Sequence, residues 1–210
     1  MVVARPGVER RRCLGRFTRL VLTLVVVSAV VIVVNSILST SSRGPDEAMA
    51  YADRVRPAVD RSTRQAAALD DLRGQAPTLG ATGLRRSVDR LVRDGREIIA
   101  AADAVSPPKR LRQAHGLLRT SLQTRADALA SLSTALGAGP DEPFDTSVDR
   151  LVTVGLDLAV ADRAYELFVQ ELPAAPRQTM PASRWVPDTT RWERPEMSAF
   201  LSTLRASASV

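Results

Sequence analysis

Hydrophobic residues are unevenly distributed along the chain, and their first block is continuous. It begins at Leu20, ends at Leu38 and contains no charged residue. As an α-helix this run would extend about 28 Å, which nearly matches a bilayer core of about 30 Å. A signal peptide has a shorter apolar region, of about 7 to 15 residues, and a clear cleavage site. The pattern predicts a transmembrane helix over residues 20–38 that anchors the chain in a lipid bilayer, with cleavage at residues 39–42 as the alternative.

Four later segments have the periodicity of amphipathic helices. They cover residues 46–73, 82–105, 108–136 and 144–172, after a polar linker at residues 39–45. In the second segment, apolar or small residues recur at alternating steps of four and three, as on a buried helix face. Pro57 interrupts the first segment and predicts a kink or a new helix start. Because short loops join the segments, we expect an all-α fold with an up-down-up-down four-helix bundle.

The hexapeptide SVDRLV occurs twice, beginning at Ser87 and at Ser147. An offset of sixty residues also aligns Gly95 with Gly155. This repeat indicates a duplicated helical hairpin, although amphipathic helices of similar composition also converge on similar strings. Glycine in a helical stripe costs about 1 kcal/mol relative to alanine, so we expect a close helix contact at both glycines, with a pocket as the less favoured alternative.

Arginines are concentrated before the apolar run. Residues 1–19 contain six of them and one acidic residue, Glu9. The arginines nearest the run are Arg10, Arg11, Arg12, Arg16 and Arg19. Basic residues beside a transmembrane helix remain in the cytoplasm, so residues 1–19 form a cytoplasmic tail and the later domain is extracytoplasmic. Most of the net charge of +6 lies in this tail, and the nearly neutral external domain lacks the basic surface that nucleic acid requires.

Cysteine and histidine each occur once, as Cys13 and His115. The external domain therefore has no disulfide, and a His-rich metal site or a His-dependent catalytic triad is not expected. The sequence contains no glycine-rich phosphate loop, GxSxG or HExxH motif. We expect no catalytic, cofactor or metal site, and the chain is not predicted to be an enzyme.

Polar residues interrupt the inner stripes of the third and fourth segments, at His115, Arg125 and Asp162. In an antiparallel hairpin around residue 140, Asp162 is level with residue 118, and Tyr165 is level with His115. The predicted polar cluster is therefore His115, Arg119, Asp162 and Tyr165. Two interpretations remain, a fully paired structural network and a site for a small polar ligand.

The C-terminal tail, residues 173–210, contains both tryptophans and five prolines. Its only helical pattern is short and places Phe200 on an apolar side. Trp185 and Trp192 stand beside Arg184, Arg191 and Arg194. Three alternatives follow for Trp185, Trp192 and Phe200: a lid packed on the bundle, contact with lipid headgroups, or a surface for a protein partner.

These features favour a non-enzymatic, membrane-anchored helical domain of the bacterial cell envelope that binds a protein partner or a small ligand. The bacterial source is expected because one lysine among 28 arginines is typical of GC-rich genomes. A structural subunit that self-associates in a membrane complex is the alternative. An enzyme with a site near His115 and Asp162 is the least favoured interpretation.

Overall fold

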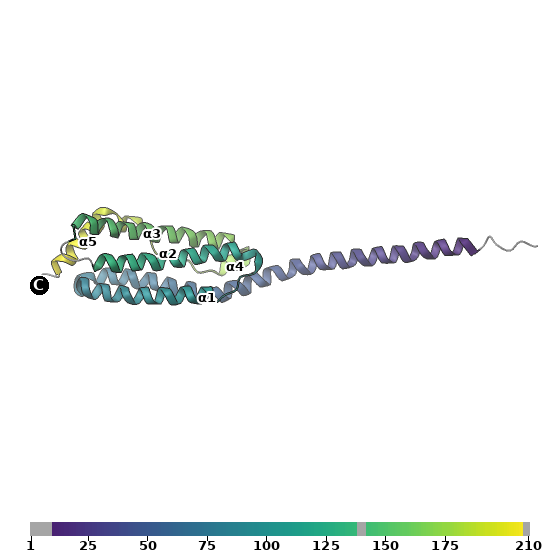
Figure 1. Cartoon of the computed structure of the whole chain (residues 1–210), viewed down its shortest axis with the longest axis horizontal. Helices are drawn as coiled ribbons and strands as arrows, with labels where there is room; N and C mark the ends of the chain where they lie inside the picture. Colours follow the sequence, from purple (N-terminus) through teal and green to yellow (C-terminus); the bar gives the residue numbers. More distant parts are fainter. Residues whose placement is uncertain (1–9, 138–141, 208–210) are drawn as a thin grey trace, which may run out of the picture. The chain divides into compact units, whose positions relative to one another are not determined.

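The computed structural model describes the backbone of residues 10–137 and 142–207, with side chains for residues 44–137 and 142–206. Its elements are α1 (Arg10–Asp103), η1 (Lys109–Leu111), α2 (Arg112–Leu136), α3 (Phe144–Glu171), α4 (Ala174–Thr179), η2 (Thr189–Trp192) and α5 (Arg194–Ser207) (Figure 1). The described residues contain no strand, and the predicted all-α class is confirmed.

Contacts divide the chain into two units, Met1–Asp46 and Glu47–Val210. In the first unit, the predicted span at residues 20–38, the flanking arginines and Cys13 lie outside the residues whose side chains are described. Where side chains are described, no helix has both the length and the apolar character needed to cross a bilayer. The membrane anchor therefore stays a prediction.

In the second unit, α1 turns back on itself at Gly80. This residue has φ 61° and ψ 176° and is the one non-helical position of α1. Residues 47–79 and 81–103 consequently run antiparallel (Figure 1). Their register is fixed by Gln65, whose Nε2 donates to the Leu91 carbonyl at 2.6 Å, and by the Arg61–Glu97 ion pair at 2.8 Å.

The loop expected between residues 73 and 82 is absent, because helical conformation continues on both sides of Gly80. A kink or a new helix start was also predicted at Pro57. The new start is wrong, since α1 keeps helical dihedral angles there. The neighbouring Val55, Ala58 and Val59 are buried against the bundle. Tertiary packing of this face stabilises the helix despite the hydrogen bond that a proline removes.

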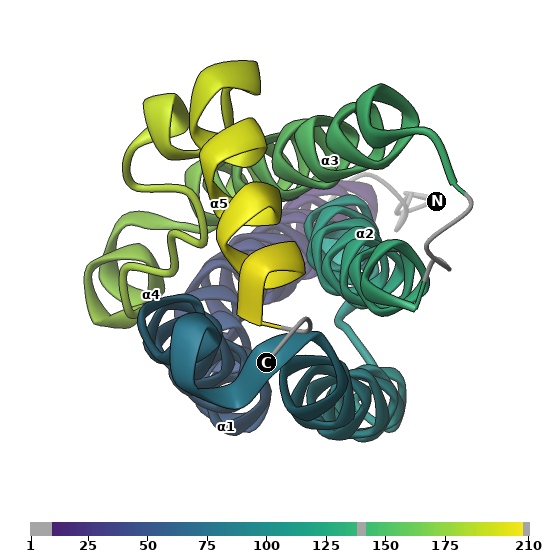
Figure 2. The ribbon, with the colours of Figure 1, turned by 90° about the vertical axis from the view of Figure 1, so that its left-hand side faces the viewer.

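Helices α2 and α3 form the second antiparallel pair and pack against the two arms of α1 (Figure 2). Their bounds agree with the predicted segments to within a few residues at each end. In both copies of SVDRLV, the valine and leucine at equivalent positions are buried: Val88 and Leu91, Val148 and Leu151. The two copies therefore bury the same two positions.

Asp89 and Arg90, the polar pair inside the first copy of the repeat, each contact a serine. Ser133 Oγ donates to Asp89, and Arg90 donates to Ser87 Oγ at 2.8 Å. Asp89 is half-buried between α1 and α2, where the serine hydroxyl replaces part of its hydration.

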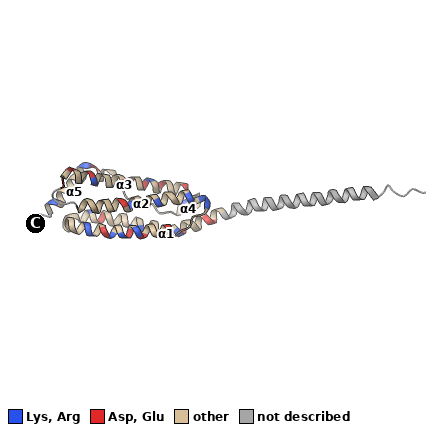
Figure 3. Cartoon of the chain, viewed as in Figure 1, with Lys and Arg blue, Asp and Glu red and all other residues tan. Residues whose placement is uncertain are grey.

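The apolar interior consists of two clusters. One contains Ala48, Tyr51, Phe168 and Leu172, so α3 ends at the same end of the bundle at which the second unit begins. The other lies around Leu84, Leu132 and Leu151 and includes side chains of the tail. After α4 the tail returns along the bundle, and α5 packs against α3 (Figure 2). Basic and acidic residues are intermixed over the bundle (Figure 3).

Candidate functional site

Arg125 of α2 and Asp162 of α3 form a buried ion pair. The distance from Arg125 Nη2 to Asp162 Oδ1 is 3.0 Å, and the two residues are 1% and 7% exposed. Each lies on the inner stripe of its helix, where leucine or valine occupies most positions. A buried charge is stable only when it is paired and hydrogen-bonded, so the remaining partners of this pair matter.

Most of those partners come from the tail. Asp162 Oδ2 accepts the backbone N–H groups of Trp185 and Val186 at 2.8 and 2.9 Å. Arg125 donates to Ser183 through Nη1 to the hydroxyl at 3.1 Å and through Nη2 to the carbonyl at 2.9 Å. Its Nη1 also donates to Ser62 Oγ of α1 at 3.0 Å.

Tyr165 extends the same set of contacts, because its hydroxyl donates to the Pro181 carbonyl at 2.6 Å. Ser62, Arg125, Asp162 and Tyr165 are referred to below as the tail clamp. Arg125, Asp162 and Tyr165 bind residues 181–186 largely through main-chain groups, and Ser62 binds Arg125. The bundle thus recognises the course of the tail backbone more than its side chains.

Burial shifts the pKa values of two residues of the tail clamp. Burial lowers the pKa of Arg125, and the adjacent Asp162 carboxylate opposes that change. The ion pair and hydrogen bond with Asp162 favour the charged form of the guanidinium. Burial raises the pKa of Tyr165, so its phenol remains a neutral donor. The Arg125 guanidinium also lies 5.4 Å from the centre of the Tyr165 ring and 5.5 Å from that of Trp185.

The structure divides the predicted polar cluster. Asp162 and Tyr165 lie together, with Arg125 between them. His115 instead lies 3.0 Å from the Tyr51 hydroxyl through Nδ1, and the ring centres are 5.9 Å apart. Arg119 is exposed and pairs with Asp103 at 2.6 Å.

Arg125 pairs with Asp162 although the two residues lie at different levels of the antiparallel α2–α3 pair. An alignment of backbone levels alone therefore does not predict this contact. Side chains of a helix incline toward its N-terminus, and arginine is long enough to reach a level about one turn or more away. The sequence signal for this contact was the position of Arg125 on the inner stripe. Tyr51, Ser62 and Ser183 also take part and were not predicted.

Burial lowers the pKa of His115, and the nearby Asp103 carboxylate partly opposes this. The imidazole is therefore neutral near pH 7 and serves as a hydrogen-bond partner of Tyr51. Among the described residues, no group of three potential metal ligands gathers at this or any other place.

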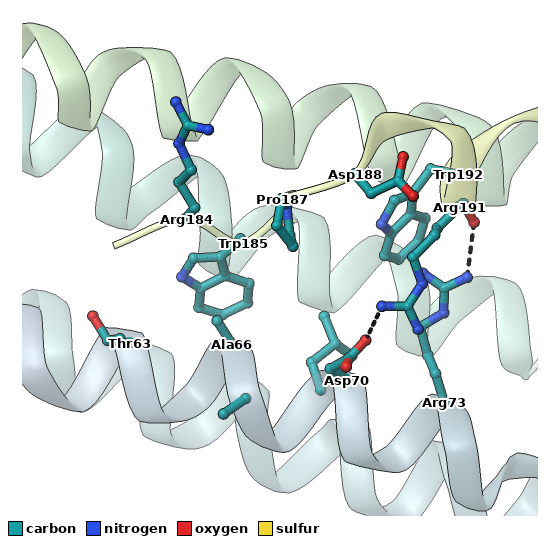
Figure 4. A pocket seen from close by; sticks show the side chains of 12 residues that line it. Thr63, Ala66, Asp70, Arg73, Arg184, Trp185, Pro187, Asp188, Arg191 and Trp192 are labelled. Carbon is teal, nitrogen blue, oxygen red and sulfur yellow. Dashed lines mark hydrogen bonds and ion pairs between the residues drawn. The ribbon is translucent and has the colours of Figure 1, made fainter. Parts of the chain in front are cut away.

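An open pocket of about 270 Å³ lies between α1 and the tail, beside the clamp (Figure 4). Its α1 wall consists of Thr63, Ala66, Ala67, Leu69, Asp70 and Arg73. Its tail wall consists of Arg184, Trp185, Pro187, Asp188, Arg191 and Trp192. The clamp fixes this second wall, because Asp162 binds the backbone at Trp185.

Charged side chains cross the pocket from one wall to the other. Arg191 of the tail pairs with Asp70 of α1 at 2.6 Å, and Arg73 donates to the Arg191 carbonyl at 2.8 Å (Figure 4). The Arg73 guanidinium lies 4.5 Å from the centre of the Trp192 ring. Burial lowers the pKa of Arg73 and the nearby Arg191 lowers it further, whereas Asp70 and Glu196 oppose this change.

Both tryptophans pack on the bundle. This is the arrangement expected of a lid, the first of the three alternatives for the tail. Trp185 and Trp192 are 6% and 8% exposed, and Phe200 is half-buried against the same cluster. The neighbouring arginines bind carboxylates of the bundle: Arg184 with Glu166, Arg191 with Asp70, and Arg194 with Asp145 and Asp149.

The predicted role of the stripe glycines as close-contact positions is confirmed. A Cβ atom placed on Gly95 would lie 3.3 Å from the Cβ of Ala126, and one placed on Gly155 would overlap the Cβ of Trp192. Gly95 thus allows approach of α2, whereas Gly155 makes room for the tail.

Comparison of the chain with protein-family models, with curated proteins and with solved structures finds no match.

Proposed function

We propose that this protein is a non-enzymatic, membrane-anchored binding domain of the bacterial cell envelope, and that its ligand or protein partner occupies the pocket between α1 and the tail. The apolar run at residues 20–38 and the preceding arginines support the anchor and an extracytoplasmic bundle.

The observation that carries the proposal is the composition of the pocket. Two aromatic rings, from Trp185 and Trp192, and charged groups of both signs converge on one open concavity. Binding sites commonly combine aromatic surface with a few polar groups that fix the orientation of a ligand. The pocket is smaller than the usual range of about 300–1,000 Å³, which favours a small molecule or a single side chain of a partner.

Site-specific photocrosslinking in native membranes tests this proposal. A photoreactive residue at Ala67, which is exposed in the α1 wall, should form an adduct that mass spectrometry identifies. The same residue at Arg93, exposed on α1 outside the pocket, is the matched control. Adducts from both positions in equal yield, or from neither, would contradict a binding role for the pocket.

A second function, self-association in a membrane complex, is favoured by one surface feature. Leu156 and Val160 lie one turn apart on α3 and are 62% and 61% exposed. Adjacent exposed apolar side chains are typical of contact surfaces. Replacement of both by Gln should convert a dimer to a monomer in detergent, as measured by light scattering; an unchanged mass would reject this function.

A further inference from the structure

Three guanidinium groups, of Arg73, Arg184 and Arg191, and two carboxylates, of Asp70 and Asp188, line the pocket. Arg184 is paired outside the pocket with Glu166, and Arg191 is paired across it with Asp70. Arg73 is the third guanidinium. Within the described part of the chain, no carboxylate lies within ion-pair distance of it, and the group it binds is a neutral carbonyl.

The surroundings of Arg73 destabilise a positive charge for which the described side chains provide no ion-pair partner. The side chain is half-buried, stacked over Trp192 and placed beside the like-charged Arg191. A guanidinium presents five N–H donors in a planar fork that fits a carboxylate, and Arg73 uses one nitrogen for the Arg191 carbonyl. Its other donors remain to bind an anion that enters the pocket.

A second unused donor lies in the opposite part of the pocket. The indole Nε1 of Trp185 is buried and has no hydrogen-bond partner among the described residues. Figure 4 shows the Trp185 ring in the wall near Thr63 and Ala66, whereas Arg73 lies at the other end. A buried N–H group without a partner is rare, because leaving it unpaired costs free energy.

We propose that the pocket binds a ligand with a carboxylate that pairs with Arg73 and a carbonyl oxygen that accepts the Trp185 indole N–H. A glutamate residue has both groups, in its side chain and its main chain. A free small carboxylate could supply the same chemistry. This inference rests on the proposed function, since it names the ligand class of the same pocket.

Intrinsic fluorescence provides a local signal, because Trp185 and Trp192 are the two tryptophans of the chain and both line the pocket. The full chain in detergent micelles is titrated with N-acetyl-glutamate amide, with its neutral glutamine counterpart, and with glutarate. We expect a saturable change of emission with the glutamate compound and none with the glutamine compound.

Saturation by the glutamate compound identifies an acidic side chain of a protein as the source of the carboxylate. Saturation by glutarate alone would support a carboxylate site at Arg73 and would identify a free small acid as the ligand. Equal responses to the glutamate and glutamine compounds, or no response to any of the three, would overturn the inference. In that case an adduct from Ala67 in native membranes would still leave the proposed binding function standing.

Variants locate the binding. Arg73→Gln removes the charge and should weaken binding of the acidic probe about tenfold or more. Arg93→Gln removes an exposed arginine of α1 away from the pocket and should leave binding unchanged. Equal effects of the two substitutions would show a nonspecific charge effect and reject the site.

Ala67→Leu keeps every charge and fills the pocket, and it provides an independent test if Arg73→Gln does not fold. The position is exposed in α1, so the substitution should preserve the circular dichroism of the bundle and abolish the fluorescence response. A folded Ala67→Leu protein that still binds the probe would place the probe elsewhere.

Discussion

Asp162 uses its two carboxylate oxygens for two different purposes. Oδ1 pairs with Arg125, which neutralises a buried guanidinium, and Oδ2 binds the backbone of the tail at Trp185 and Val186. One side chain thereby links the interior of the bundle to the position of the pocket wall.

Asp162→Ala should destabilise the protein by about 3–5 kcal/mol, because it leaves the buried Arg125 charge without a counter-ion and the N–H groups of Trp185 and Val186 without an acceptor. Urea denaturation of the full chain in micelles measures this. The control is Asp157→Ala on the same helix, which should change stability by less than about 0.5 kcal/mol. Similar losses for the two substitutions would show that Asp162 is not a central contact.

Gly155 is a second residue on which tail docking depends. Gly155→Ala should cost about 1–3 kcal/mol, since the new methyl group overlaps the backbone-proximal Cβ of Trp192 and cannot be relieved by a rotamer change. It should also shift tryptophan emission to the red as the ring leaves its buried position.

The matched substitution is Gly116→Ala in α2, where a Cβ would meet no atom within 4 Å. There the higher helix propensity of alanine should stabilise the protein by about 0.5–1 kcal/mol. If Gly155→Ala also stabilised the chain, the close contact between α3 and the tail would be refuted.

At the scale of elements, the course of α1 depends on the backbone conformation of one residue, Gly80. A φ of 61° with ψ of 176° belongs to a region that essentially only glycine occupies, and Gly80 uses it to reverse the chain without a separate loop. This tight reversal brings Leu84 and Val88 of one arm beside the cluster that contains Leu69 of the other.

Gly80→Ala should therefore lower the midpoint of thermal unfolding, with a loss of about 1–3 kcal/mol from backbone strain. Gly74→Ala, six residues earlier in helical conformation with open space around it, should raise the midpoint. Circular dichroism melts of the two variants beside the original chain measure both effects. A tolerated alanine at residue 80 would mean that the turn has a different conformation in solution.

At the scale of the whole molecule, the sequence separates a strongly basic N-terminal segment from a domain of nearly balanced charge. Arginines before an apolar run are a topological signal, and they do not require that the domain itself bind an anionic polymer. The intermixed charges on the bundle are consistent with this separation (Figure 3).

Protease added to intact cells without their wall should therefore digest residues beyond 40 and leave an epitope tag at the N-terminus protected. Immunoblotting with antibodies to the tag and to the bundle measures both products. Lysis with detergent is the control and should remove the protection of the tag. Degradation of the tag in intact cells would contradict the predicted orientation.

The sequence by itself determined the helical class, the inward faces of α2 and α3, and the need for a close approach at Gly95 and Gly155. These properties follow from spacing along one chain segment, because residues three or four apart share a helix face in any tertiary arrangement. The burial of Val88, Leu91, Val148 and Leu151 has this origin.

Only the tertiary structure decided that Arg125, rather than His115 or Arg119, binds Asp162, and that the tail completes this pair. It also decided that α1 passes through Pro57 and turns at Gly80. These outcomes depend on side-chain length, on helix register and on the requirement that every buried polar group find a partner. Each involves residues far apart in sequence, between which periodicity specifies no distance.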